Sequence, residues 1–490
     1  MRINKVLLSV HVSLGAAALL ILFGPAHAQT VGATIDETSV QRNYYVAADS
    51  TASDSSDGLS WATAFATLQK AVTTARANSL AQGLKTKIWM AEGTYTGGYG
   101  SGLGVGDTWP GHGTDTVLII EGQGTGGATL SGRNLSLYFP SKSNLVLRNI
   151  TVTGAGGNFG IPGAGVAIDG NAHKDYRFNN ALLENVKAIG CLGRGIDVDG
   201  EHHVTLRRCI AKNNNGEGML MIGRWNRSEN CVVTGNNYPN APADNRGGFY
   251  FIGQDCIVDH LNSSNNRGTG FRCDFQAKNV TLTNSTFNNN FGIGTDGTGT
   301  DHAAHGITFE IAEGPIAITH CQAVGNSGSG LAISTSHNIT VDGCTLKDNK
   351  MSQVEVTVEG NRRDGVVYTD TQWFQGWVTD ASGKLVTAGN RTISDVLKTT
   401  IKNSTLTTTR GSTSRIFWNE NNSDAGYREW AVSQFTGSNN TYFNDATQNA
   451  FLRNGSEYVD LPTWRIWTKT DTDSTWGTNS HPVVLTEIKR

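Results

Sequence analysis

A hydrophobic pattern of the strand type recurs along the middle of the chain. From about Gly193 to Asn349, a Gly-x-Gly-apolar-x-apolar segment leads into a β-branched strand and then into an asparagine turn. The separations between successive turns are 22, 30, 24, 36 and 23 residues, and the two long ones contain insertions. The turns fall at Asn214, Asn236, Asn266, Asn290, Asn326 and Asn349. A period of this size, built of strands, predicts a coiled β-solenoid in which each turn of chain stacks on the one before.

The alternation within each repeat predicts which side chains face the core. Apolar pairs such as Ile196/Val198, Phe271/Cys273 and Ile307/Phe309 should point inward, and their neighbours outward. The outward positions of the central repeats are Arg194, Asp197, Asp199, Glu217, Tyr250, Arg272, Asp274, His305 and Glu310. Only 17% of the chain is charged, and the flanking repeats place alanine or serine at the same positions. We therefore predict a functional face on the central coils.

The two ends of the chain have a different pattern. Apolar residues between Trp61 and Ala77 have helical spacing, which predicts an N-terminal helix that caps the raw end of the solenoid. The predicted organisation is a lead-in and cap over 29–130, a β-helix over 131–460 and a C-terminal plug over 461–490. Insertions are expected at 237–245, 291–304 and 359–400, and the first two would emerge beside the charged face.

Residues 1–28 read as a secretory signal. Arg2 and Lys5 precede an apolar stretch, and Ala26-His27-Ala28 fits a small-x-small cleavage site. An uncleaved membrane anchor is the rival interpretation, weakened by polar residues in the span. Cleavage after Ala28 predicts a secreted or periplasmic protein with no further membrane segment. The net charge is -3 and no basic run is present, which argues against a nucleic-acid partner.

The seven cysteines leave two interpretations open. Cys209 and Cys231 each lie five residues before an asparagine turn, as do Cys321 and Cys344, so each pair should occupy one column of adjacent coils. An exported protein could oxidise either pair to a disulfide, but free cysteines are also common small core residues. No cysteine or histidine spacing suggests zinc.

The N-terminal region resembles a known family. The stretch YYVAADSTASDSSDGLSWATAFATLQKAV, followed by IWMAEGTYT, is similar to the opening of secreted right-handed parallel β-helix proteins of the pectate-lyase-like superfamily. The resemblance continues through the coils to at least residue 358. It implies an all-β fold, a single-stranded right-handed parallel β-helix with an N-terminal capping helix. It does not fix the reaction, because this superfamily contains hydrolases, lyases, epimerases and non-enzymes.

The charged face suggests acid/base chemistry on a polysaccharide. Asp274 and Glu310 should share a column in consecutive coils, with carboxyls roughly 5–7 Å apart. Paired acids at such spacings perform glycoside hydrolysis, and Arg272 would favour one ionised acid while crowding keeps the other protonated. A glycoside hydrolase is the leading hypothesis, with Asp197 and Asp199 as a second candidate pair. The predicted substrate-binding residues are Arg194, Glu217, Tyr250, Arg272, His305 and His302.

Two other functions stay open. NNRGTGFRCDF resembles a coil of mannuronan C5-epimerases, and IDVDGEHHVTL is similar to their aspartate–proline–histidine coil, with Gly200-Glu201 where that family has proline and histidine. The resemblance implies a lyase or epimerase in which Arg272 or Arg194 neutralises a uronate carboxylate and Tyr250 or His305 exchanges the C5 proton. The mixed charge of the face favours a neutral or weakly acidic glycan and hydrolysis. A non-catalytic glycan-binding solenoid is the third hypothesis.

No cofactor is expected. The loop from Asp296 to Asp301 offers oxygen ligands of the kind that Ca²⁺ prefers, although such Gly/Asp loops are common in turns. Calcium therefore remains only an alternative to the prediction of a metal-free protein.

Overall fold

The computed structural model describes most of the chain after residue 30. The described residues are 31–96, 116–124, 126–132, 135–138, 144–155, 164–169, 180–199, 203–237, 247–274, 277–292, 304–310, 312, 314–334, 336, 338–357, 366–368, 391–393, 398–410, 415–420, 434–453 and 457–477. The predicted signal segment, His302 and the Asp296–Asp301 loop lie outside these residues.

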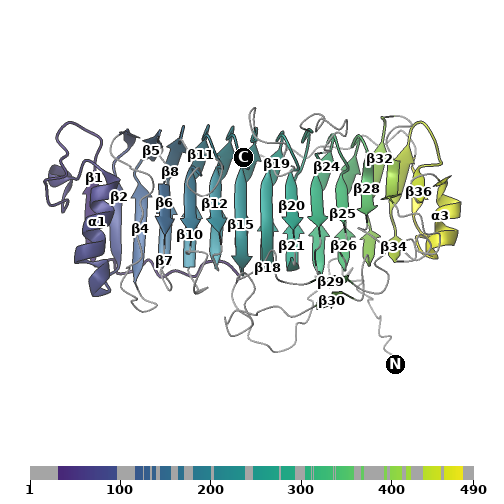
Figure 1. The fold of residues 1–490 in the computed structure, drawn as a ribbon, viewed down its shortest axis with the longest axis horizontal. Helices are drawn as coiled ribbons and strands as arrows, with labels where there is room; N and C mark the ends of the chain where they lie inside the picture. Colours follow the sequence, from purple (N-terminus) through teal and green to yellow (C-terminus); the bar gives the residue numbers. More distant parts are fainter. Residues whose placement is uncertain are drawn as a thin grey trace, which may run out of the picture.

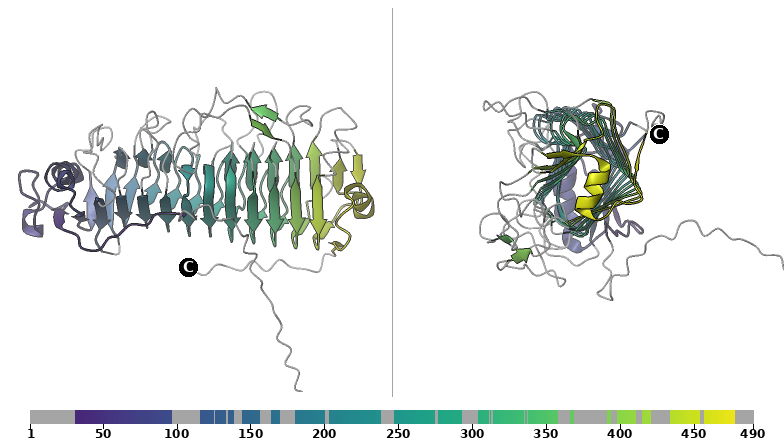
Figure 2. Two further views of the ribbon diagram at one scale, coloured as in Figure 1. Left: turned by 90° about the horizontal axis from the view of Figure 1, so that it is seen from below. Right: turned by 90° about the vertical axis from the view of Figure 1, so that its right-hand side faces the viewer.

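The described chain winds into an elongated stack of coils with a helix at each end (Figure 1). Seen end-on, successive coils superpose (Figure 2). Each complete coil contributes one strand to each of three parallel faces, and the pairing runs from coil to coil along the whole stack. This is the predicted all-β solenoid.

The face that carries the Gly-x-Gly strands is called the site face below. Its strands are β6 (Leu135–Tyr138), β9 (Val166–Asp169), β12 (Ile196–Asp199), β15 (Met219–Arg224), the first part of β18 (Phe249–Asp259), β20 (Phe271–Asp274), β22 (Ile307–Glu310), β25 (Leu331–Ser334), β28 (Ser352–Thr357), β33 (Arg415–Glu420) and β36 (Phe451–Arg453). β37 (Glu457–Val459) closes this face as an antiparallel partner of β36.

The second face begins earliest in the chain. Its strands are β1 (Arg42–Val46), β2 (Thr86–Met90), β4 (Val117–Gly122), β7 (Asn144–Arg148), β10 (Asn180–Glu184), β13 (Val204–Arg207), β16 (Arg227–Glu229), the second part of β18, β21 (Lys278–Thr283), β23 (Ile316–Thr319), β26 (Ile339–Asp342), β31 (Thr399–Lys402) and β34 (Phe435–Ser438). Parallel coils therefore start at β1 and not at residue 131, because β1 pairs β2 and β2 pairs β4. The predicted boundary followed a change of sequence pattern that does not interrupt the pairing.

The third face is made of short strands. They are β3 (Gly93–Tyr95), β5 (Ala128–Ser131), β8 (Ile150–Thr153), β11 (Lys187–Ile189), β14 (Ile210–Lys212), β17 (Val232–Thr234), β19 (Asn262–Ser264), β24 (Gln322–Val324), β27 (Thr345–Lys347), β32 (Thr405–Thr408), β35 (Thr441–Asn444) and β38 (Thr475–Trp476). Bridges through Thr286 link β19 to β24. Within the 359–400 insertion, β29 (Val366–Tyr368) and β30 (Arg391–Ile393) form an antiparallel pair.

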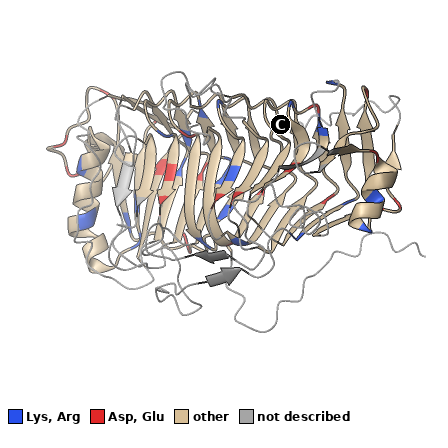
Figure 3. Cartoon of the chain, turned by 45° about the vertical axis from the view of Figure 1, so that its right-hand side comes forward, with Lys and Arg blue, Asp and Glu red and all other residues tan. Residues whose placement is uncertain are grey.

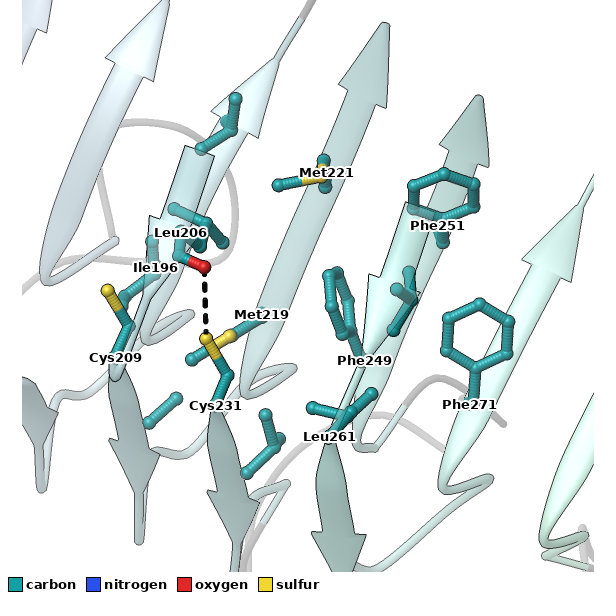
Figure 4. Packing of buried hydrophobic residues seen from close by; sticks show 14 of the residues in the cluster. Ile196, Leu206, Cys209, Met219, Met221, Cys231, Phe249, Phe251, Leu261 and Phe271 are labelled. Carbon is teal, nitrogen blue, oxygen red and sulfur yellow. Dashed lines mark hydrogen bonds between the residues drawn. The ribbon is translucent and has the colours of Figure 1, made fainter. Parts of the chain in front are cut away.

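The core is a column of stacked side chains. Phe249 and Phe251 lie on β18, Phe271 lies on β20 of the next rung, and all three are within 1% of full burial. Their ring centroids lie about 6 Å apart (Figure 4). Inward residues such as these were predicted from the alternation, and burial of their rings supplies most of the driving force for stacking.

A buried asparagine ladder holds one corner of every central coil. All six predicted turn asparagines are fully buried. Each donates from its side-chain amide to the Oδ1 of the next, at 2.8–3.2 Å from Asn214 to Asn349, and Gln353 Oε1 accepts the last bond at 2.9 Å. The same Oδ1 atoms also accept backbone N–H bonds from the preceding coil, so the ladder satisfies polar groups that the corner would otherwise leave unpaired.

Each asparagine follows a residue in the left-handed conformation, which turns the chain. Asn213, Asn265 and Asn289 adopt φ values of 55–59°, and Gly235 and Gly325 adopt 66° and 70°. Asparagine and glycine tolerate this region best. The Asn-rich turns in the sequence thus combine two roles, since the first residue bends the backbone and the second enters the ladder.

All seven cysteines are free and buried. Cys209 and Cys231 do stack in one column, as do Cys321 and Cys344, and Cys321 N–H donates to Cys344 Sγ at 3.4 Å. These four cysteines lie at the corner between the second and third faces. In later coils Ser404 and Asn440 occupy the corresponding positions. The structure therefore supports the core interpretation over either disulfide.

Helices close both ends. α1 (Leu68–Asn78) begins after a Thr67 N-cap, because Phe65 pairs with Val46 and a 3-10 turn, η1 (Trp61–Thr63), precedes it. The predicted helix therefore starts seven residues late, and η2 (Leu80–Gln82) follows it. At the other end α3 (Leu461–Thr468) places Trp464 over Phe451, with ring centroids 5.1 Å apart. No described helix is both long and apolar enough to span a membrane.

The lead-in from residue 31 to 41 lies across the outer surface of the second face. Gly32 N–H donates to the Trp225 carbonyl, and both side-chain oxygens of Glu37 accept from Arg148 at 2.8 and 2.9 Å. Ile35 and Val40 cover an outward apolar patch on β4 and β7. This segment therefore joins coils that are distant in sequence and removes apolar surface from water.

Replacing Asn290 with alanine tests the ladder. The change N290A removes the acceptor of the Asn266 backbone and side-chain N–H groups and the donor to Ser263 and Asn326. Because buried groups are left unsatisfied, we expect a loss of about 3 kcal/mol in the free energy of unfolding, measured by urea denaturation. The exposed Asn262 provides the control, with N262A expected within about 0.5 kcal/mol of the parent. Equal effects of the two changes would contradict the ladder's role.

Candidate functional site

Strand register brings the predicted charged residues onto one face. Asp197, Leu220, Tyr250, Arg272, Thr308, Ala332 and Glu355 share one outward column. Asp274 and Glu310 pair directly in the next outward column. Acidic and basic positions lie on neighbouring strands of the central coils (Figure 3). The vertical registry on which the site prediction depended is therefore present.

Arg272 organises the first charged centre. Its Nε donates to Asp274 Oδ2 at 3.2 Å, and its Nη2 donates to Glu310 Oε2 at 2.5 Å. Nη2 also lies 3.1 Å from Asp274 Oδ2. Tyr250, which precedes Arg272 in the column, donates its hydroxyl to the same Asp274 oxygen at 3.2 Å. One guanidinium thus contacts both candidate catalytic acids.

Arg194 organises a second centre of the same design. Its Nη1 donates to Asp197 Oδ2 at 2.9 Å and its Nε donates to Glu217 Oε2 at 3.0 Å. The two neighbouring acids raise the pKa of Arg194, although burial opposes them. Asp199 lies two residues along β12 and is partly buried. The Asp197/Asp199 pair therefore sits three coils away from Asp274 and belongs to a separate centre.

A third, mostly neutral cluster follows on the next coils. His305 Nδ1 accepts the Ser329 backbone N–H at 2.9 Å, so the ring proton of the neutral imidazole lies on Nε2. Ser329 Oγ contacts Ser352 Oγ at 2.8 Å and donates to Glu355 Oε2 at 2.5 Å. His305 Nδ1 lies 3.9 Å from that carboxylate oxygen.

Burial moves the two titratable groups of this cluster in opposite directions. Desolvation, with help from the charge of Arg272, lowers the pKa of His305 to about 4. Desolvation raises the pKa of Glu355, against the opposing effects of Ser329 and Arg415. In each case burial shifts the pKa in the direction that favours the neutral form of the group.

Several outward residues are buried although they point away from the core. Asp197 and Asp274 are each 1% exposed, whereas Arg194 and Arg272 keep 18% of their side chains exposed. The sequence predicted their direction but not their burial. Ionic contacts at such positions are less screened by water than surface pairs.

Two details of the sequence hypothesis need correction. Arg272 contacts both Asp274 and Glu310, whereas the prediction had it favour the ionised form of one of them. Glu355, Ser329 and Ser352 were also missing from the predicted site. Ser329 belongs to a flanking repeat without outward charges. In the coil that carries Glu355, the residues Met351-Ser352-Gln353 stand where the other coils have Gly-x-Gly. Counting onward from the Asn349 turn would have found Glu355 in the outward column.

The described residues include no cluster of three or more His, Cys, Asp or Glu side chains arranged for a metal ion. The predicted substrate-binding residue His302 and the candidate Ca²⁺ loop lie outside the described residues. The roles predicted for them remain predictions.

The raised pKa of Glu355 predicts how the stability of the protein depends on pH. The folded-state pKa of Glu355 lies above its ordinary value of 4.5, so the folded protein holds more protons above that pH and loses stability as pH rises. The variant E355Q removes this loss, and its stability relative to the parent should increase as pH rises above 4.5. Urea unfolding across that range, with the exposed Glu92 changed in E92Q as control, measures it. A pH-independent difference would show that Glu355 is not the titrating group.

Three comparisons place the chain among known proteins. Residues 164–346 match the family model described as the right-handed beta helix region. No curated protein matched by sequence. Solved structures with similar coils include the A-module of the Azotobacter vinelandii mannuronan C-5 epimerase AlgE6, at 15% identity and a TM-score of 0.45, covering 83% of this chain and 93% of that one.

Two further similar structures are the periplasmic alginate epimerase AlgG and the pectate lyase Pel9A. The first is 10% identical with a TM-score of 0.44, covering 77% of this chain and 82% of that one. The second is 17% identical with a TM-score of 0.41, covering 79% and 81%. Identities this low say nothing about the reaction. The parallel coils, together with the match to the right-handed beta helix region, make the fold of this chain a parallel β-helix.

Proposed function

We propose that the site face binds a polysaccharide and transfers protons at a uronate unit, as a C5-epimerase or a lyase. The observation that carries this proposal is the Arg272 centre, in which one guanidinium contacts both Asp274 and Glu310. The proposal replaces hydrolysis, the leading hypothesis from the sequence. An exported location, in keeping with the signal-like segment 1–28, belongs to the same proposal.

Hydrolysis by an Asp/Glu pair needs one protonated acid to donate to the leaving oxygen. A guanidinium in contact with a carboxylate stabilises its ionised form. Because Arg272 contacts both acids, neither Asp274 nor Glu310 is suited to be that donor. Proton abstraction beside a uronate carboxylate needs other groups, namely a cation, a proton acceptor and a donor.

The Arg272 centre and the neighbouring His305 offer these groups. Arg272 Nη1 makes no hydrogen bond to any described residue, and the side chain is 18% exposed, so it can receive a substrate carboxylate. Tyr250 donates its hydroxyl to Asp274, so it can take up the C5 proton if its own phenol proton passes to that carboxylate. Neutral His305 carries its proton on Nε2, where it can donate a hydrogen bond to a substrate oxygen.

Two products are then accessible from one intermediate. The acceptor removes the C5 proton, and the electron pair is stabilised by the carboxylate held at Arg272. Return of a proton to the opposite face of C5 gives the epimer. If instead the C4–O bond breaks, a C4=C5 double bond forms and the leaving oxygen takes the proton.

A second candidate is hydrolysis of a neutral glycan. It is favoured by the excess of acids on the face, where Asp197, Asp199, Glu217, Asp274 and Glu310 outnumber two arginines. A net negative face repels a polyuronate, and carboxylates bind sugar hydroxyls well.

A glycan panel separates the two candidates. The protein is incubated with mannuronan, polygalacturonate and neutral glucans and xylans. New reducing ends, ultraviolet absorbance from a C4=C5 bond, and C5 configuration by proton NMR are then followed. We expect absorbance or C5 inversion on a uronan. New reducing ends without absorbance, on a neutral glycan, would establish hydrolysis instead.

The variant Y250F tests the proton acceptor. Loss of the phenol oxygen should lower kcat at least a hundredfold, because general acid/base groups contribute about 10²–10⁴-fold. Tyr45, which lies on the first coil of the second face, gives the control variant Y45F with unchanged turnover. Turnover by Y250F within a few-fold of the parent would remove Tyr250 from the proposed role.

A further inference from the structure

Two charged centres on the site face have matching construction. We propose that the Arg194 centre is a second glycan subsite and that the ligand is an extended chain long enough to span both centres. The inference rests on the proposed function at Arg272 and adds the minimum length of the substrate.

The match extends to the contacts of each guanidinium. Arg194 bonds Asp197 from its own coil and Glu217 from the next, as Arg272 bonds Asp274 and Glu310. Among the described residues, Arg194 Nη2 and Arg272 Nη1 each make no hydrogen bond. Both side chains are 18% exposed. Each centre thus presents a fixed guanidinium edge beside carboxylate oxygens, a combination that suits a sugar carboxylate or a pair of hydroxyls.

The separation of the centres follows from strand pairing. β12 pairs β15, β15 pairs β18 and β18 pairs β20, so three coil steps lie between Arg194 and Arg272. At about 4.8 Å a step this is roughly 14 Å along the stack, and Arg272 also lies three positions further along its strand, in register with Asp197. One step is comparable with one sugar unit of an extended chain, so a ligand that occupies both centres needs about four units.

The surface between the centres is apolar. Leu220, Ile222 and Tyr250 form a cluster on the outward side of β15 and β18, with Ile252 packed against it and partly exposed. No charged side chain interrupts the outward positions of these two strands from Leu220 to Ile222 and from Tyr250 to Ile252. The cluster itself is 2–9% exposed, so Ile252 is the residue that offers apolar surface to the C–H face of a sugar ring. Polar ends and an apolar middle therefore match one continuous oligosaccharide.

Chain-length dependence tests the inference. The variants R194Q and R272Q are assayed on mannuronate and galacturonate oligomers from dimers to octamers. We expect R194Q to raise KM about tenfold for tetramers and longer chains and progressively less for shorter ones, the loss of one charge-assisted bond to the ligand. R272Q should reduce turnover at every length. R227Q, on the second face and also paired to an acid, is the control with unchanged kinetics.

The outcomes are distinguishable. An R194Q effect equal at all lengths would overturn the second subsite while leaving the proposed reaction intact. If the parent turns over no uronan, calorimetric binding of the same oligomers and of neutral gluco- and xylo-oligomers decides the inference. The inference is supported if affinity rises sharply between trimers and pentamers for the parent but not for R194Q. It is refuted if the parent shows no such rise. Thermal unfolding and the variant R194K, which keeps the charge, separate loss of folding from loss of binding.

Discussion

The asparagine ladder is the interaction on which the rest of the molecule depends. The sequence within one solenoid coil does not fix the register of its strands, because these strands pair with strands of the next coil. The buried amides from Asn214 to Asn349 fix that register, since each must align with the next to satisfy both its donor and its acceptor. An error of one residue would bury unsatisfied polar groups and also exchange the inward and outward faces of the following strand.

The fixed register gives the site its geometry. Residues that are 24 to 38 positions apart in sequence become hydrogen-bonded neighbours, as in Tyr250–Asp274 and Arg272–Glu310. Strands hold them more rigidly than loops would, so the donors and acceptors are positioned before any ligand arrives. The ladder therefore determines which residues lie side by side, and the few outward residues of the coils determine the chemistry of the site face.

The sequence predicted the parts of this structure that repeat. The asparagine spacing and the inward phenylalanines establish the coils, and strand alternation correctly paired Asp274 with Glu310. It could not predict quantities that depend on side-chain geometry across coils. One guanidinium shared by two acids, the burial of Asp197 and Asp274, and the Ser329–Glu355 contact are examples. Glu355 was missed because its coil lacks the glycine marker, although its count from the turn is regular.

The second face supplies an internal comparison for the charges of the site face. There Glu121, Arg148, Glu184, Arg207 and Glu229 follow one another in register with alternating sign, so each of the three inner charges has opposite neighbours on both sides. Trp89 precedes this run and Asp259 follows it. Alternating sign is the arrangement expected when ion pairs only join coils.

On the site face the charges do not alternate. They gather into two centres with an excess of acid, separated by apolar residues, and their acids include the most buried carboxylates, Asp197 and Asp274. Burying charge in this way costs stability compared with an apolar face. The coils already stack through asparagine amides and phenylalanine rings, so the two centres are not required for stacking, and the ligand that we propose would account for them.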